Sequence, residues 1–185
     1  GSTAIGWDMP VDSVLVVAPH PDDETLGCGA TLLRQAADGA SLHWAVVTAM
    51  TPERFDAEAI RRRRDEIAAV AELYGFESVH ELGYPAGALE GVPMADLVAA
   101  IGEVVRQTAA STIYLPAPDD AHTDHRVVYE AASAATKWFR YPSVRRVRVY
   151  ETLSETDVSL DSTWRPNLFV DVTGHVEGNV AAMRL

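Results

Sequence analysis

The sequence predicts an α/β fold: a Rossmann-like three-layer sandwich with a mostly parallel sheet, formed by a single domain. Short apolar runs alternate with helix-patterned segments along the chain, which is the order typical of βαβ units. The first run, Val14–Ala18, is continuously apolar, as expected for a strand buried on both faces. A length of 185 residues suits one compact domain. We assign residues 13–185 to this domain and residues 1–12 to an N-terminal tail, whose first two residues we interpret as left from cloning.

Six segments are expected to be strands, because each is a short run rich in apolar or β-branched residues. Turn-forming residues bound most of them, and Pro116 ends the fourth. In chain order the expected strands are Val14–Ala18, Ser41–Val47, Val79–Leu82, Ile113–Leu115, Val147–Tyr150 and Leu168–Val172.

Five further segments carry helical patterns between or after these strands. The second helix places Ile60 and Ile67 on one face, and the third repeats Leu97 and Ile101 at helical spacing. A glycine follows each of the first two helices and ends it. The expected helices are Gly27–Asp38, Phe55–Tyr74, Met94–Thr108, a segment from the polar loop Asp119–Asp124 to about Trp138, and Val176–Leu185.

Charge and composition exclude several classes of function. Asp and Glu number 27 against 15 Lys and Arg, a net charge of −12, which disfavours a nucleic-acid partner. One cysteine allows no internal disulfide and no Cys-rich zinc module. The apolar runs are too short to span a membrane, and no signal segment opens the chain. We therefore expect a cytoplasmic protein and leave open whether it forms a homo-oligomer.

Polar clusters follow two of the expected strands. The first, residues 19–24, reads PHPDDE, and the second, residues 116–125, reads PAPDDAHTDH. In a doubly wound sheet, ligands bind at the carboxyl ends of the strands. Because both clusters follow strands directly, they are the place to look for a functional site.

The spacing within the clusters suits a divalent metal. His20 and Asp23 are three residues apart, so a tight turn or a first helical turn can place both around one point. Asp22 lies between them and projects elsewhere, which leaves it available as a base. His122 and His125 are also three apart and share a face at a helix start. One of these two histidines can complete the metal site while the other faces the substrate.

These residues also carry a family resemblance. The segment Val16–Gly29, VVAPHPDDETLGCG, together with His122–His125, HTDH, resembles the LmbE-like, or PIG-L, family of zinc-dependent N-acetylglucosaminyl deacetylases. Arg63 and Glu66 on the second helix also match the family's pattern. The resemblance covers nearly the whole chain from about residue 13. Chains of this family usually continue beyond the point where this one stops, so a C-terminally truncated chain, a short member and an engineered form remain open interpretations.

The resemblance implies a catalytic metal centre. It implies that His20, Asp23 and His125 hold Zn²⁺, with Fe²⁺ or another divalent metal as an alternative. Asp22 would then be the general base of the reaction.

The resemblance implies three further roles. His122 would stabilise the oxyanion and protonate the leaving amine. Asp124 would orient and charge a neighbouring histidine. Arg63 would contact hydroxyl or phosphate groups of the substrate.

The function implied in this way is zinc-dependent hydrolysis that removes the acetyl group from an N-acetylglucosamine-type amino sugar or its conjugate and releases acetate. The partner would be a small-molecule amino-sugar conjugate. Two alternatives remain: hydrolysis of another small amide, such as a mycothiol conjugate, and a non-catalytic, metal-binding member of the family.

Other features are expected to be structural. The run Arg61–Arg64 reads as a solvated helix face, with Arg63 as the exception, and Cys28 reads as a buried packing residue. The isolated histidines, residues 43, 80 and 175, are expected at the surface or at strand ends. The aromatic segment Trp138–Pro142 either stacks on a sugar at the rim of the site or packs against the sheet.

Overall fold

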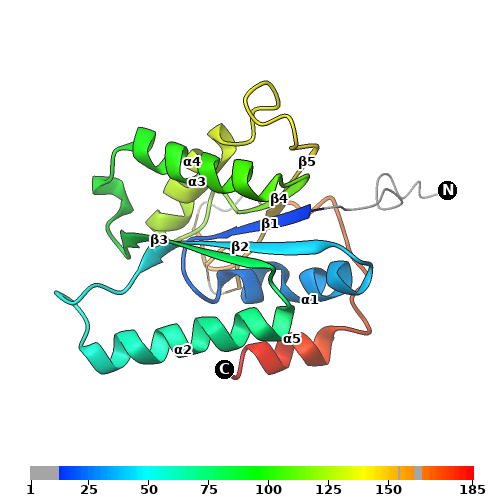
Figure 1. Ribbon diagram of the computed structural model, residues 1–185, viewed down its shortest axis with the longest axis horizontal. Coiled ribbons are helices and arrows are strands. Elements are labelled where there is room, and N and C mark those ends of the chain that lie inside the picture. Colours follow the sequence, from blue (N-terminus) through cyan, green and yellow to red (C-terminus); the bar gives the residue numbers. More distant parts are fainter. Residues whose placement is uncertain (1–12, 154, 161–163) are drawn as a thin grey trace.

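The computed structural model describes residues 13–153, 155–160 and 164–185, so the assigned tail 1–12 lies outside the described residues. Five parallel strands form one sheet in the order β3-β2-β1-β4-β5 (Figure 1). The strands are β1 (Ser13–Ala18), β2 (Ser41–Ala49), β3 (Ser78–Pro85), β4 (Thr112–Pro116) and β5 (Arg146–Tyr150).

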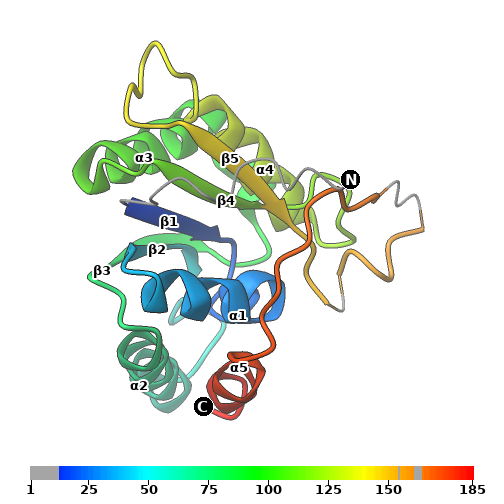
Figure 2. The same ribbon diagram turned by 90° about the vertical axis from the view of Figure 1, so that its right-hand side faces the viewer.

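Helices cover both faces of this sheet. Helices α1, α2 and α5 lie on one face, and α3 and α4 lie on the other (Figures 1 and 2). Their bounds are α1 (Asp23–Ala37), α2 (Ala57–Tyr74), α3 (Met94–Thr108), α4 (Thr123–Ala134) and α5 (Val176–Ala182), with a short 3₁₀ turn η1 (Leu89–Gly91). The expected three-layer α/β sandwich is therefore confirmed.

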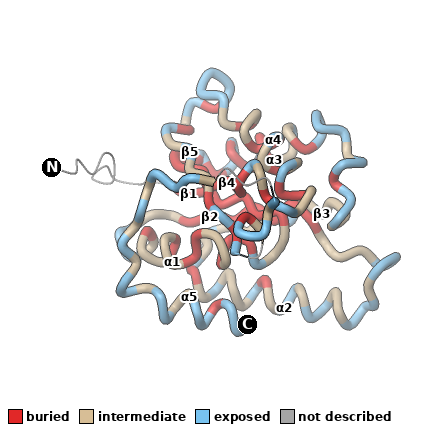
Figure 3. The backbone as a smooth tube through the Cα atoms, turned by 180° about the vertical axis from the view of Figure 1, so that it is seen from behind, coloured by how far each residue is buried: buried red, intermediate tan, exposed pale blue. Residues whose placement is uncertain are grey.

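The central strand explains why the two helical layers are needed. All residues from Val14 to Ala18 are fully buried, so β1 needs an apolar layer on each side. Val16 packs in one cluster with Leu32 of α1, whereas Val17 packs in the other with Ile101 of α3. Figure 3 shows the buried residues concentrated around the sheet.

Two expected helix ends were wrong. Helix α1 begins at Asp23 rather than at Gly27, because the acidic residues Asp23 and Glu24 form its first turn, where the helix dipole favours negative charge. The polar cluster after β1 is thus partly helical. Helix α4 ends at Ala134 and does not reach Trp138.

The expected sixth strand, Leu168–Val172, was also wrong, since no strand is present between residues 164 and 172. Alternate residues of this segment are half-buried, and Phe169 between them is 81% exposed. The alternation is therefore real, but the extended backbone forms no ladder with β5. Side-chain alternation alone does not distinguish a paired strand from an extended segment.

The aromatic segment at residues 138–142 does not lie at the rim of the site. It precedes β5, and because β5 runs parallel to β4, it lies at the opposite edge of the sheet from the cluster that follows β4. Trp138 and Phe139 are exposed there, while Tyr141 is buried.

The expectation that His43 lies at the surface or at a strand end was also wrong. His43 is buried within β2, and its Nδ1 lies 2.8 Å from Ser78 Oγ.

The sheet order fixes where a ligand can bind. β1 pairs with β2 on one side and with β4 on the other, so the chain reverses its direction of winding between β1 and β4. Crevices at the carboxyl ends of strands beside such a reversal are the usual binding sites of open α/β sheets. Both polar clusters begin there. Among the described residues, no helix combines the length and apolar character that a membrane span would need.

Candidate metal centre and active site

Three side chains from the two clusters converge on one point. Asp23 Oδ2 lies 3.3 Å from His20 Nδ1 and 3.2 Å from His125 Nε2. His20 comes from the loop after β1, Asp23 from the first turn of α1, and His125 from the first turn of α4. Their ligand atoms all lie within 4.8 Å of one another, an arrangement that could hold a metal ion.

A carboxylate orients each of the two histidine rings from outside this group. Asp124 Oδ2 lies 3.0 Å from His20 Nε2, and Asp120 Oδ2 lies 2.7 Å from His125 Nδ1. Each ring therefore turns one nitrogen toward Asp23 and the other toward a buried carboxylate. Such carboxylate–histidine pairs are the usual support of histidine metal ligands.

A second group, His20, His122 and Asp124, also meets the distance condition for a metal. However, both oxygens of Asp124 are already engaged. Its Oδ2 accepts from the Gly87 N–H at 2.7 Å, and its Oδ1 accepts from the Leu89 N–H at 3.2 Å. The loop after β3 thus holds Asp124 beside His20, and the group with Asp23 is the better fit to a metal ion.

The electrostatics of the cluster reflect these short contacts. Burial opposes protonation of His20 and His125, but hydrogen bonds with their carboxylate partners raise the pKa of His20 to about 9 and that of His125 to about 10. Burial also works against ionisation of Asp23, yet hydrogen bonds from the two histidines lower its pKa to about 2. The site without metal is therefore a network of paired charges.

Asp22 lies beside this group without joining it. It precedes α1 with φ 132° and ψ −26°, an unusual conformation for a residue with a side chain, and its carboxylate makes no capping bond to the helix. With His20 and Arg63, it lines a cavity of about 200 Å³. Burial, followed by the charge of Asp23, raises the pKa of Asp22 to about 6.

His122 lies on the other side of the centre, half-buried at the N-terminus of α4. Its ring centroid is 4.5 Å from that of His20 and 5.3 Å from that of His125. Its Nδ1 accepts a hydrogen bond from the Asp124 N–H at 3.1 Å, so the neutral ring carries its proton on Nε2. Burial, and then the charge of His20, lowers the pKa of His122.

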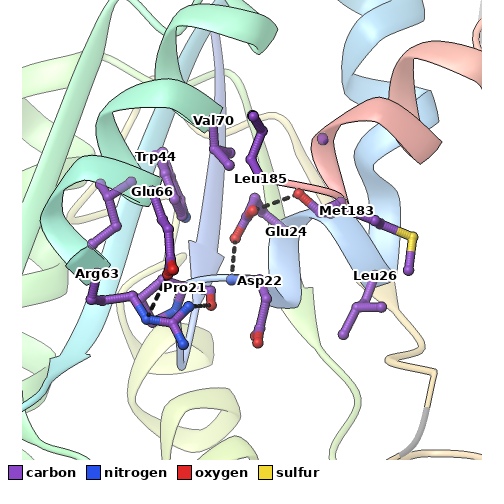
Figure 4. A pocket seen from close by; sticks show the side chains of 13 residues that line it. Pro21, Asp22, Glu24, Leu26, Trp44, Arg63, Glu66, Val70, Met183 and Leu185 are labelled. Carbon is purple, nitrogen blue, oxygen red and sulfur yellow. Dashed lines mark hydrogen bonds and ion pairs between the residues drawn. The ribbon is translucent and has the colours of Figure 1, made fainter. Parts of the chain in front are cut away.

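Arg63 is the half-buried member of the arginine run, and it lines the 200 Å³ cavity together with the exposed Arg64. Its Nη1 donates to the Pro21 carbonyl at 3.2 Å, and its Nε lies 3.3 Å from Glu66 Oε2 (Figure 4). Arg63 also lines a second cavity of about 310 Å³, whose lining includes Met183 and Leu185. The other three arginines of the run are exposed, as expected for a solvated helix face.

Sequence reasoning missed Asp120, which is fully buried and holds His125. The hydroxyl of Thr156, from the loop after β5, donates a hydrogen bond to the other carboxylate oxygen of Asp120, Oδ1. Asp120 lies only five residues before His125, but this was a weak signal, because no pattern distinguishes it from the adjacent Asp119. Only the fold shows which one faces the histidine.

Known proteins resemble this chain in sequence and in fold. A diacetylchitobiose deacetylase of Thermococcus kodakarensis is 27% identical over 186 residues, covering 94% of this chain and 68% of that protein. A 2′-N-acetylparomamine deacetylase of Streptomyces fradiae is 29% identical, covering 91% and 70%. The crystal structure of the conserved protein TT1542 from Thermus thermophilus has a TM-score of 0.74 at 27% identity, covering 93% of this chain and 76% of that chain.

A parallel α/β sandwich with a His/Asp/His group at its reversal point, together with such relatives, defines a hydrolase that acts on amide bonds. The chain belongs to the PIG-L family: the family model described as GlcNAc-PI de-N-acetylase matches residues 15–136.

Proposed function

We propose that this protein is a metal-dependent deacetylase that hydrolyses the acetamide of an N-acetylglucosamine-type amino sugar or its conjugate. The products are acetate and the free amine. The observation that carries the proposal is the convergence of His20, Asp23 and His125 beside a separate carboxylate, Asp22, in a cavity. The deacetylase relatives support the amino-sugar class, and the alternative of another small amide has no comparable support.

We assign His20 Nδ1, Asp23 Oδ2 and His125 Nε2 as the ligands of a zinc ion. Two imidazole nitrogens and one carboxylate form the donor set of a catalytic zinc site, which keeps a position open for water or substrate. When bound, zinc supplies Lewis-acid chemistry: it makes water acidic enough to react near neutral pH and polarises the amide carbonyl. Asp124 and Asp120 orient the two histidines from outside.

We assign Asp22 as the general base. Its carboxylate is adjacent to the metal ligands in sequence but outside their group, so it is available to accept a proton from the attacking water. The proton accepted by Asp22 is then available for the nitrogen of the departing amine. This transfer balances the hydrolysis, since the amine must be protonated to leave.

We assign His122 as a donor to the carbonyl oxygen. Its Nε2–H is available because its Nδ1 is engaged with the Asp124 backbone. A donor aimed at the developing oxyanion typically lowers the barrier by about 3 kcal/mol. That His122 also protonates the amine remains a prediction.

We assign Arg63 as a substrate-binding residue. Its guanidinium has five N–H donors, and its contacts with Pro21 and Glu66 leave donors that face the cavities. Hydroxyl or phosphate groups of the substrate would accept from them. We also propose a cytoplasmic location, where the buried thiol of Cys28 meets reducing conditions.

The test is acetate release from a panel of N-acetylated amino sugars, with simple N-alkylacetamides as controls. We expect the zinc-loaded protein to turn over the amino sugars, and the chelator-treated protein to regain activity on addition of zinc. Absence of acetate release from every amino sugar, with zinc bound at one equivalent, would overturn the proposed reaction. Equal turnover of the alkylacetamides would overturn the substrate class.

A further inference from the structure

The backbone of Asp22 adopts a conformation that the residue would not choose by itself. Its φ of 132° is one of two positive values among the non-glycine residues described. Such a conformation persists only where neighbouring groups hold it, and strained residues of this kind gather at functional sites. Because we assign Asp22 as the base, what holds its backbone also sets where its carboxylate points.

The side chain of Glu24 holds this backbone. Glu24 is fully buried, and its Oε2 accepts the Asp22 N–H at 3.1 Å. Its Oε1 accepts the Thr25 hydroxyl at 2.6 Å. Figure 4 shows Glu24 on one side of the Asp22 backbone and the Asp22 carboxylate on the other. Glu24 belongs to neither group that could hold a metal, so its buried carboxylate has no role in the reaction described so far.

The bonds continue from Glu24 to two other helices. Tyr74 OH, from the end of α2, lies 3.2 Å from Thr25 Oγ1 and 2.8 Å from Asn179 Oδ1 of α5. Its single proton is donated to one of these two acceptors at a time. Residue 29 is a glycine at the point where these groups meet α1. A Cβ there would lie 2.2 Å from Tyr74 OH and 1.9 Å from Asn179 Oδ1, so a larger residue would displace both.

We propose that Glu24 is a positioning residue for the reaction: it fixes the backbone of Asp22, and Tyr74 and Asn179 fix Glu24 through Thr25. The inference rests on the proposed function, because it gives Asp22 the role of base. It assigns to α5 and to the end of α2 a part in catalysis although neither provides a group that reacts. These contacts are made by hydroxyl groups and by the carboxylate of Glu24. Substitutions that keep the shape of a side chain can therefore test whether its hydrogen bonds or its charge position Asp22.

The first test compares Glu24→Ala with Glu24→Gln. Alanine removes the acceptor of the Asp22 N–H, and we expect kcat to fall about 100-fold, the effect of a small misplacement of a reacting group, with KM nearly unchanged. Glutamine keeps an acceptor for that N–H. Its amide can donate to Thr25, whose hydroxyl then turns to Tyr74 while Tyr74 donates to Asn179. We therefore expect Glu24→Gln to retain kcat within a few-fold of wild type.

The second test uses Tyr74→Phe, which removes one hydroxyl and leaves Glu24 in place. The matched control is Tyr114→Phe, because Tyr114 is also buried on the α1 side of the sheet but its hydroxyl forms no hydrogen bond to any of these groups. We expect kcat to fall about ten-fold in Tyr74→Phe and to stay unchanged in the control, with equal zinc content in the three proteins and each fully folded at the assay temperature.

A double variant separates positioning from a general structural effect. If Tyr74 acts through Asp22, then Tyr74→Phe should lower kcat no further in an Asp22→Asn background. The same loss in both backgrounds would overturn the inference. A kcat of Glu24→Ala within two-fold of wild type would also overturn it, if Asp22→Asn has a low kcat. In contrast, full activity of Asp22→Asn itself would show that the proposed base is wrong, and the positioning role would fall with it.

Discussion

The Oδ2 atom of Asp124 lies 3.0 Å from Nε2 of His20, and this contact decides which nitrogen of His20 faces the candidate metal centre. With Nε2 engaged, Nδ1 is turned toward Asp23 and His125. The loop after β3 holds Asp124 in turn through two backbone N–H groups. The position of the histidine is therefore determined in part by a loop that contributes none of the three proposed ligands.

A metal that binds this group should stabilise the folded protein. At a free zinc concentration of 100 times Kd, linkage predicts a gain of about 2.7 kcal/mol in the free energy of unfolding. We expect chelator to lower the melting temperature and zinc to restore it, measured by differential scanning fluorimetry. The control is His125→Ala, which should show no comparable response to zinc. An equal response in His125→Ala would contradict the assigned ligands.

Asp120 should affect metal affinity although it is not a ligand. Asp120→Asn removes the charge that supports His125, and we expect zinc affinity to fall about 10- to 100-fold, as is typical when such partners are lost. Competition with a chromophoric chelator measures the change. Asp157→Asn, an exposed carboxylate of the loop after β5, is the matched control and should bind zinc as wild type does. A matching loss in both variants would point to a general charge effect instead.

Arg63 should act on substrate binding. Arg63→Ala removes donors that face both cavities, and we expect KM to rise about 10- to 100-fold with a smaller change in kcat, since a lost hydrogen bond to a charged group typically costs about 1.5–3 kcal/mol. Steady-state kinetics of acetate release measure this. Arg61→Ala removes an exposed arginine two residues away on the same helix and should leave KM unchanged. A rise of KM in both would show that the charge of α2, rather than Arg63, attracts the substrate.

Cys28 should be unreactive in the folded protein. Burial, and then the charge of Glu24, raises the pKa of the thiol well above its ordinary value, so little thiolate forms near neutral pH. We expect a disulfide reagent to label no thiol in the native state and one per chain after unfolding in denaturant. Fast labelling of the native protein would show that the α1 interior opens readily.

The parts of the fold that followed from sequence are those governed by local pattern. Helix α3 begins and ends where its apolar spacing predicts, because its buried stripe alone determines the helix. Strand β1 was equally clear, since a continuous apolar run is needed on a strand covered from both sides. The segment 168–172 misled because pairing with a neighbouring strand is a tertiary event that alternation does not encode.

The candidate site divides in the same way. Spacing brought His20 and Asp23 together, and the structure also brings His125 to them as expected. Asp120 was missed, because nothing in the sequence shows which of the adjacent acids Asp119 and Asp120 contacts His125. The backbone conformation of Asp22 was equally invisible, since aspartate gives no sign of a positive φ in the way that glycine does.

The most direct test of Asp22 as the general base compares kcat of Asp22→Asn with kcat of wild type at equal zinc occupancy. The substitution keeps the shape of the side chain and removes its ability to accept a proton. General-base catalysis typically contributes about 10²- to 10⁴-fold, so kcat should fall within that range while zinc stays bound at one equivalent. An Asp22→Asn protein that keeps both its zinc and the wild-type kcat would contradict the assignment of Asp22 as the base.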